Sequence, residues 1–272
     1  MRRLKRLAVI GVGLIGGSFA LALRRAGVTT EVVGCDRDQQ SLERATALGV
    51  IDQAAESASE AARGADLVVV AVPVRATAGV LHDVGRALSA GAVVTDVGST
   101  KGEVVRSARD ALRERFSRFV PAHPIAGRET SGVEAAGADL FRAARVVLTP
   151  EADTDADAID LVHACWEATG ARVATMAALD HDRVFAAVSH LPHLLSFALI
   201  SDIVARDNAQ ELLGFAAGGF RDFTRIAASS PEMWRDIALQ NRAAILEELE
   251  RYGARLAVFR ELIGKGDGPG LE

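Results

Sequence analysis

The feature that most constrains the fold of this chain is a run of six residues near the amino terminus, Gly11-Val12-Gly13-Leu14-Ile15-Gly16. An apolar, β-branched segment precedes the run and a segment with helical spacing follows it, so the run predicts a tight turn from a strand into a helix. Gly11 suits the turn, Gly13 lets a ligand approach the backbone, and Gly16 lets the helix pack closely on the strand. Because the first N–H groups of a helix bind anions, the run predicts a site for the pyrophosphate of a dinucleotide.

An acidic residue at the end of the next β-branched segment indicates which dinucleotide binds. Asp36 lies twenty residues beyond Gly16, and its carboxylate can accept hydrogen bonds from the adenosine ribose while repelling a 2′-phosphate, which favours NAD. Arg37 leaves NADP open, because a guanidinium can pair with a phosphate or cover the adenine. Val72 and Pro73 end a later strand, where sheets of this kind form their ligand crevice. The residues expected to bind the cofactor are Gly11, Gly13, Leu14, Ile15, Gly16, Asp36, Arg37, Val72, Pro73 and Ser99.

The spacing of apolar residues predicts an α/β fold, with a Rossmann-like, doubly wound sheet domain followed by an all-α domain. Short β-branched runs alternate with helical segments and predict a parallel sheet. These runs are residues 7–12, 31–35, 66–72, 92–97, 119–122, 145–149 and 171–176, with a helix at 154–169. Beyond residue 177 the apolar spacing is helical, over 180–206, 209–217 and 231–263, with Pro192 interrupting the first stretch. We therefore expect a nucleotide-binding domain over residues 1–177 and a helical domain over residues 178–272.

The composition is that of an ordinary soluble protein, with 49% hydrophobic and 25% charged residues. A net charge of -5 argues against a nucleic-acid or membrane-surface binder, since such proteins concentrate basic residues on one face. Cys35 and Cys165 lie far apart and favour a reducing compartment, and no metal site is expected. The basic start and the apolar stretch to Leu23 resemble a signal peptide, but the glycines of the turn interrupt that stretch, so a cytoplasmic location is expected. The short helical region favours a homodimer.

Polar segments at the ends of two predicted strands mark a second site. Residues 96–101 lie at the carboxyl end of one strand, and residues 123–129 lie at the carboxyl end of the next, so both are expected to open onto the same crevice. In the helical region, residues 180–182, 189–193 and 218–225 concentrate polar side chains inside apolar stretches. Such groups require partners or a function when they are buried.

These motifs together resemble the prephenate and arogenate dehydrogenase family along the whole chain. The resemblance is carried by the glycine run and by residues 96–101, 123–132, 189–193 and 220–236. It implies an NAD-dependent enzyme, closest to prephenate dehydrogenase, that converts prephenate oxidatively to 4-hydroxyphenylpyruvate and CO2 in tyrosine biosynthesis. The substrate is then a small dianion, with no nucleic acid or membrane as partner.

The reaction needs a base at the ring hydroxyl, and we assign that role to His123. A neutral imidazole has a suitable pKa range and can hold a hydrogen bond to the hydroxyl as hydride leaves. The resemblance implies that Ser99 assists by positioning His123 or the hydroxyl against the nicotinamide. Lys101 is expected to order the loop between them.

Five residues are expected to bind the substrate. Arg225 suits one carboxylate, because a guanidinium binds it by a bidentate fork, and His193 addresses the remaining polar end. Ser189 lies four residues before His193 and therefore on the same helical face. The resemblance implies that Glu129 pairs with Arg225 or gates the site, and that Trp234 influences whether a keto or an amino side chain is accepted.

Two histidines keep open roles. His181 either anchors the start of its helix or serves the site, and His190 faces either the core or the site. His82 and His163 lack a motif and are expected to be structural.

Three other functions compete with the one above. Arogenate dehydrogenase is the closest, since its substrate differs by an amino group. A 3-hydroxyacid or 6-phosphogluconate dehydrogenase shares the two halves but needs a lysine in the helical domain, where only Lys265 occurs. A nucleotide-sensing module without chemistry would not need His123 together with Arg225.

Overall fold

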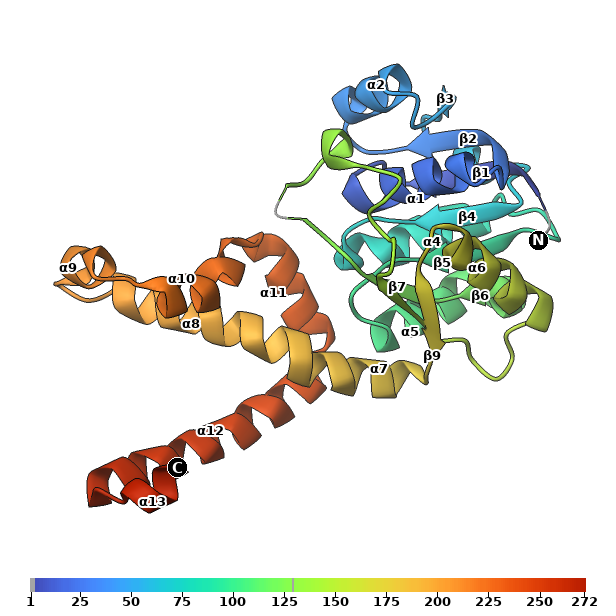
Figure 1. Ribbon diagram of the computed structural model, residues 1–272. Helices are drawn as coiled ribbons and strands as arrows, with labels where there is room; N and C mark the ends of the chain where they lie inside the picture. Colours follow the sequence, from blue (N-terminus) through green and yellow to red (C-terminus); the bar gives the residue numbers. More distant parts are fainter. Residues whose placement is uncertain (1–2, 129) are drawn as a thin grey trace. The chain divides into compact units, whose positions relative to one another are not determined.

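The computed structural model describes residues 3–128 and 130–272, and these form two compact units (Figure 1). The first unit is Met1–His181 and the second is Asp182–Glu272. The change from mixed to purely helical structure falls at α7 (Ala178–Phe185), whose residues belong to both units.

The first unit is built on a six-stranded parallel sheet with the order β3-β2-β1-β4-β5-β6. In chain order its elements are β1 (Leu4–Ile10), α1 (Leu14–Arg25), β2 (Thr29–Cys35), α2 (Gln39–Ala47), β3 (Gln53–Ala54), α3 (Ala58–Ala62), β4 (Leu67–Val70), α4 (Thr77–Gly85), β5 (Val93–Asp96), α5 (Gly102–Leu112), β6 (Phe119–Val120), β7 (Ala122–Ile125), β8 (Arg145–Leu148), α6 (Ala156–Ala168) and β9 (Arg172–Thr175). The strand order is that of a dinucleotide-binding doubly wound sheet, which confirms the predicted fold class.

The strands are apolar throughout because both faces of the sheet are covered. Alternate residues of β1 enter different cores: Leu7 and Val9 pack with α1 and α6, whereas Ala8 and Ile10 pack with α3, α4 and α5. The largest fully buried side chain among the described residues, Trp166, packs against Phe19 with the ring centroids 4.5 Å apart. This two-sided burial holds the carboxyl ends of the strands, and therefore the glycine turn, in fixed positions.

A second, three-stranded sheet corrects the expectation of one continuous parallel sheet. Its order is β7-β8-β9, with β7 antiparallel to β8. The sequence predicted His123 at the carboxyl end of a strand of the main sheet. His123 lies instead inside β7. Pro121 provides the physical reason: it has no N–H to continue the pairing of β6 with β5, so the parallel ladder ends at Val120.

The second unit is helical among its described residues, as the sequence predicts, but its helices are more divided. After α7, residues Ala186–His190 form a π-helical segment, followed by α8 (Leu191–Val204), α9 (Ala209–Gly214), α10 (Gly218–Thr224), α11 (Pro231–Gln240), α12 (Arg242–Lys265) and α13 (Gly268–Leu271). The π-helical segment precedes Pro192, which lacks the N–H that a regular α-helix needs there. The stretch expected as one helix over 231–263 divides at Asn241, between α11 and α12.

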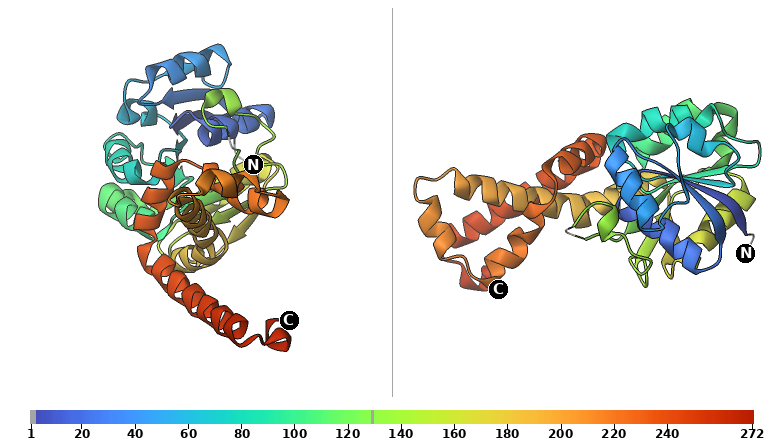
Figure 2. Two further views of the ribbon diagram at one scale, coloured as in Figure 1. Left: turned by 90° about the vertical axis from the view of Figure 1, so that its left-hand side faces the viewer. Right: turned by 90° about the horizontal axis from the view of Figure 1, so that it is seen from above.

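α12 is the longest helix of the second unit and is largely uncovered. In the left-hand view of Figure 2 it runs without a break, and of its 24 residues only Ile245 is buried. Apolar side chains that it leaves exposed include Leu246, Leu256, Phe259 and Ile263. An apolar surface of this extent marks an interaction site.

The residues Ala178–Val204 meet the length and hydropathy criteria for one membrane-spanning helix within the described chain, with a mean hydropathy of 1.6. Helices in the cores of soluble proteins meet the same criteria. Asp180, Asp182 and Arg183 lie within the segment, and charged groups are costly in a bilayer.

Candidate functional site

The glycine turn joins β1 to α1 and has the geometry of a ligand cradle. Gly11 has φ +95°, and a Cβ there would lie 2.3 Å from the carbonyl oxygen of Ala71. A Cβ on Gly16 would lie 2.2 Å from the carbonyl oxygen of Gly11. Among the described residues, a Cβ on Gly13 would meet nothing within 4 Å. Gly11 and Gly16 are thus required by the fold, whereas Gly13 leaves open space beside the backbone.

The start of α1 is suited to an anion. Leu14 and Ile15 form its first turn and are half-buried, and no side chain caps the helix at Gly13. The first turn also contains no acidic residue. The N–H groups and the positive end of the helix dipole are therefore left for a bound group such as a pyrophosphate.

Asp36 is tied to the glycine turn. Its Oδ2 accepts a hydrogen bond from the N–H of Val12 at 2.9 Å, and its Oδ1 accepts one from the N–H of Asp38 at 3.1 Å. The carboxylate is half-buried and its position is set by these two bonds, while the neighbouring Arg37 is exposed. These bonds hold the Asp36 carboxylate beside the glycine turn, and Arg37 is placed on the surface.

Val72, Pro73 and Ser99 lie on the loops that follow β4 and β5. The side chain of Val72 lies next to Gly11, since a Cβ on that glycine would be 3.2 Å from its Cγ1. Pro73 is exposed and Ser99 is half-buried. The hydroxyl of Ser99 makes no hydrogen bond to any residue that the structure describes, so it can bond a ligand.

A buried ion pair fixes the loop that carries Ser99. Oδ2 of Asp96 lies 2.5 Å from Nζ of Lys101 and accepts from the N–H of Gly98 at 2.7 Å. Both groups also hold Ala122: its N–H donates to Oδ1 of Asp96 at 3.2 Å, and its carbonyl accepts from Lys101 at 2.7 Å. Lys101 was expected to order this loop, but its ion pair with Asp96 was not predicted. Its only signal was an acidic residue five positions before the lysine.

His123 follows Ala122 and contacts a second histidine. Its Nδ1 lies 2.8 Å from Nε2 of His181, in the first turns of α7, and the ring planes are inclined by 64°. His181 is fully buried, whereas His123 is half-buried. Both rings belong to the first unit, so the fold brings together residues that are 58 positions apart in sequence. This contact was not predicted.

In the second unit, His193 and Trp234 are stacked. Their ring centroids are 3.7 Å apart with an interplanar angle of 20°, and Nδ1 of His193 lies 2.9 Å from the carbonyl oxygen of Ser189. A carbonyl can only accept, so Nδ1 carries the proton and Nε2 of the neutral ring is left as an acceptor. Burial lowers the pKa of His193, and the positive charge of nearby Arg225 lowers it further, against the opposing effect of the Ser189 carbonyl.

The other residues predicted in this unit lie on several of its helical segments. Arg225 is exposed at the end of α10, and Ser189 lies in the π-helical segment. Trp234 is 7% exposed, and its indole N–H is buried without an acceptor among the described residues. His190 is buried beside Trp234 and is 3.1 Å from the side-chain amide of Asn241. Glu129, the remaining predicted residue, lies outside the described residues.

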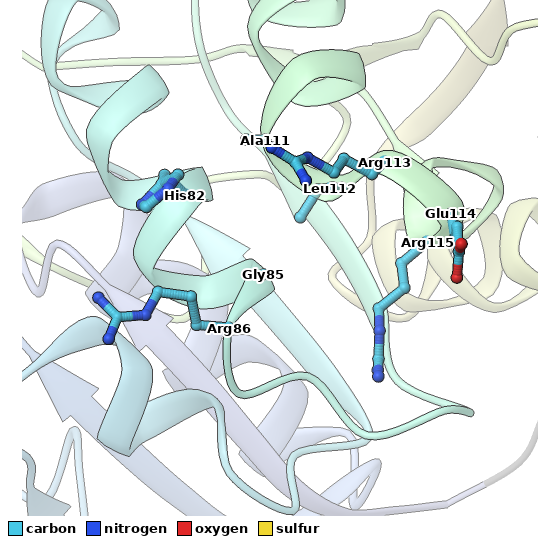
Figure 3. A pocket seen from close by; sticks show the side chains of 8 residues that line it. All are labelled: His82, Gly85, Arg86, Ala111, Leu112, Arg113, Glu114 and Arg115. Atoms are coloured by element: carbon cyan, nitrogen blue, oxygen red, sulfur yellow. The ribbon is translucent and has the colours of Figure 1, made fainter.

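Two cavities differ in their relation to these residues. One of about 160 Å³ is lined by Leu194, Phe197, Pro231, Trp234, Arg235 and Ala238, and so adjoins the stacked tryptophan. A larger one of about 450 Å³ lies between the ends of α4 and α5 and includes His82, Arg86, Arg113 and Arg115 (Figure 3). α4 and α5 run antiparallel to the strands that they connect, so their carboxyl ends lie near the amino ends of these strands. The glycine turn, in contrast, follows the carboxyl end of β1. The larger cavity contains none of the predicted site residues.

Comparison with known proteins gives a consistent result. The family model described as "Prephenate dehydrogenase, nucleotide-binding domain" matches residues 19–175, and the one described as "Prephenate dehydrogenase, dimerization domain" matches residues 177–272. A cyclohexadienyl dehydrogenase of Zymomonas mobilis is 38% identical over 266 residues, covering 97% of this chain and 90% of the relative.

Solved structures are similar over the same length. A prephenate dehydrogenase of Aquifex aeolicus, in complex with hydroxyphenyl propionate and NAD+, has a TM-score of 0.90 and 38% identity, covering 96% of this chain and 91% of that one. An arogenate dehydrogenase of Synechocystis has a TM-score of 0.83 and 30% identity, covering 98% of this chain and 94% of that one.

Proposed function

This chain belongs to the prephenate dehydrogenase family, and we propose that it catalyses the NAD-dependent oxidative decarboxylation of prephenate to 4-hydroxyphenylpyruvate in tyrosine biosynthesis. The observation that carries the proposal is the similarity of the whole chain, at a TM-score of 0.90, to a prephenate dehydrogenase. Both halves of the chain take part in the match, so the relationship extends beyond a shared nucleotide-binding sheet.

The first unit fits NAD. The open space at Gly13, the uncapped start of α1 and the carboxylate of Asp36 provide a place for the pyrophosphate and an acceptor for the ribose hydroxyls. NAD, when bound, supplies the acceptor for the hydride that leaves ring C4 of the substrate. Leu14, Ile15, Val72 and Pro73 complete the proposed binding residues, and the exposed Arg37 covers the adenine.

His123 is the proposed base. The substrate hydroxyl gives its proton to the imidazole while the C4–H bond breaks, and C4 becomes a carbonyl carbon. The bond from ring C1 to its carboxylate then breaks, CO2 leaves, and the electron pair enters the ring, which becomes aromatic. Prephenate and NAD+ balance against 4-hydroxyphenylpyruvate, CO2 and NADH with no net proton, so His123 can return its proton to the phenolate oxygen. Ser99, whose hydroxyl makes no hydrogen bond to a described residue, holds the same oxygen.

Residues of the second unit are proposed to bind the substrate carboxylates. Arg225 supplies a bidentate guanidinium for one carboxylate, and the proton-free Nε2 of His193 accepts from a water that donates to the remaining polar end of the substrate. Trp234 holds the ring of His193 in place by stacking. Ser189 of the same unit and Glu129 of the first unit complete the proposed set.

L-Arogenate is the second candidate substrate, because one similar structure is an arogenate dehydrogenase. It carries an amino group where prephenate carries a keto group, so the two differ at the side chain and not at the reacting ring.

We also propose a homodimer formed through the second unit, since the apolar surface of α12 is exposed in the single chain and this unit matches a dimerization domain. A cytoplasmic location fits the two free, buried cysteines. Light scattering coupled to size exclusion tests the oligomeric state.

One assay tests the activity: the purified protein is given NAD+ with prephenate and, separately, with L-arogenate, and NADH formation is followed at 340 nm. We expect turnover with prephenate. Without turnover of either substrate the enzymatic proposal would be wrong. His123→Asn is expected to lower kcat by about 10²-fold or more with KM little changed. An effect on KM alone would instead assign His123 to binding.

A further inference from the structure

A second histidine, His181, contacts His123, the residue proposed as the base. Nδ1 of His123 and Nε2 of His181 are 2.8 Å apart, a hydrogen-bonding distance. Their ring centroids are 5.0 Å apart and their planes are inclined by 64°, so the contact is an edge contact and not a parallel stack. His181 has no exposed surface, so water does not compete for this contact.

The chain fixes both ends of the contact. The backbone of His123 is held by the pairing of β7 with Val147 of β8 and by the two bonds from Asp96 and Lys101 to the preceding residue. His181 is held in the first turn of α7, where its N–H donates to the carbonyl of Ala177 at 2.9 Å. With its backbone fixed, the remaining freedom of His123 is rotation of its ring, and the bond at Nδ1 restricts that rotation.

The bond also selects a tautomer. Two nitrogens at this distance share one proton, so one ring donates and the other accepts. A base acting through Nε2 of His123 must have that nitrogen free of a proton, which puts the proton of the neutral ring on Nδ1. Nδ1 then donates to Nε2 of His181, which must be neutral. The opposite arrangement, with His181 as donor, would protonate Nε2 of His123 and remove the base.

Proton uptake strengthens the same bond. When His123 accepts the substrate proton it becomes an imidazolium, and its Nδ1–H then makes a charge-assisted hydrogen bond, which is stronger than a neutral one. An interaction that grows during the reaction stabilises the transition state more than the ground state.

We infer that His181 is a positioning residue, which holds His123 in the tautomer and orientation that present Nε2 as a base, and which stabilises its protonated form. This inference rests on the proposed role of His123. The acceptor is a neutral imidazole, in the place where many histidine bases have a carboxylate.

Three substitutions separate positioning from packing. In His181→Gln, the amide oxygen can lie where Nε2 lies in histidine and can accept from Nδ1 of His123. In His181→Asn the amide reaches only to the position of Nδ1, and in His181→Leu no acceptor remains. His82→Asn, at an exposed histidine, is the control for loss of an imidazole.

We expect His181→Asn and His181→Leu to lower kcat by about 10- to 100-fold, as is typical when the partner that orients an active imidazole is lost, with KM for prephenate little changed. His181→Gln should recover most of that loss. Thermal unfolding of the Gln and Asn variants is expected to be equal. Equal kcat for Gln and Asn, or losses that follow thermal stability, would overturn the positioning role.

A second measurement does not depend on turnover. Long-range ¹H–¹⁵N NMR of protein labelled with ¹⁵N-histidine reports which ring nitrogen carries the proton, and His123→Asn assigns the signals. We expect His123 as the Nδ1–H tautomer in the unsubstituted protein and a mixture in His181→Leu. An Nε2–H tautomer in the unsubstituted protein would overturn the inference. Failure of the proposed function would be seen instead in the unsubstituted enzyme, as absence of NADH formation.

Discussion

The ammonium group of Lys101 lies 2.5 Å from Oδ2 of Asp96, and both side chains are completely enclosed. The two residues lie on either side of Ser99 in the sequence. Asp96 accepts a hydrogen bond from the N–H of Ala122, and Lys101 donates one to the carbonyl of Ala122, the residue before His123. A Cβ on Gly98 would lie 2.9 Å from Oδ2 of Asp96, which explains the glycine in this loop. One ion pair therefore sets the relative position of the two residues to which we assign the chemistry at the hydroxyl.

Removing one partner of this pair should destabilise the first unit strongly. Lys101→Met leaves a buried carboxylate without its cation, and such changes typically cost about 3–5 kcal/mol. Chemical denaturation checks this in a Trp234→Phe background, where the remaining tryptophan, Trp166, reports on the core of the first unit. Lys265→Met, at an exposed pair with Glu261, is the matched control. Equal effects of the two substitutions would contradict the structural role of the pair.

Two glycines of the turn should respond differently to alanine. Gly13→Ala is expected to leave thermal stability nearly unchanged, because its Cβ meets no described atom within 4 Å, but to weaken NAD binding by about tenfold or more as the methyl group occupies the ligand space. Gly11→Ala should destabilise the protein itself, since φ is +95° and the Cβ would clash with Ala71. Calorimetric titration with NAD+ and thermal unfolding check both. Unaltered NAD+ affinity in Gly13→Ala would place the pyrophosphate elsewhere.

The carboxylate of Asp36 should govern the choice of cofactor. Asp36→Asn keeps an acceptor for the N–H of Val12 and removes the charge, so KM for NAD+ is expected to rise and KM for NADP+ to fall. Steady-state kinetics with both cofactors measures the change. Arg37→Gln in the same background should reverse the gain with NADP+ if the guanidinium pairs with the 2′-phosphate. An unchanged NADP+ preference in Asp36→Asn would contradict the assignment of Asp36 to the ribose.

The pKa of His193 should lie below its ordinary value of 6.5, since burial and the charge of Arg225 both disfavour the imidazolium. A lowered folded-state pKa means that this residue supports folding above pH 6.5 and that its contribution is lost as the pH falls toward the folded-state value. NMR titration should find the pKa higher in Arg225→Gln than in the unsubstituted protein. Arg221→Gln, at an exposed arginine of α10, should leave it unchanged. If the pKa of His193 were the same in Arg225→Gln as in the unsubstituted protein, the proximity of His193 and Arg225 would be contradicted.

Local patterns predicted the elements that depend on local chemistry. The glycine run and the β-branched segments gave the turn and the strands, because their conformations follow from steric limits and from burial of both sheet faces. The division of the helical stretch 231–263 at Asn241 was not predicted, because the apolar spacing continues across Asn241. The antiparallel pairing of β7 was missed because pairing partners lie far apart in sequence, although Pro121 marks the break.

The sequence by itself determined the fold class and the dinucleotide turn, since both follow from residue types at short spacing, and it predicted His123 as the base. Only the tertiary structure decided what surrounds that base. It joined Asp96 and Lys101 to the strand that carries His123, and it placed His181 against the ring across 58 residues of chain. The physical reason is that a buried polar group takes its role from its partner, and partners in a folded chain are set by packing of distant elements and not by the neighbouring sequence.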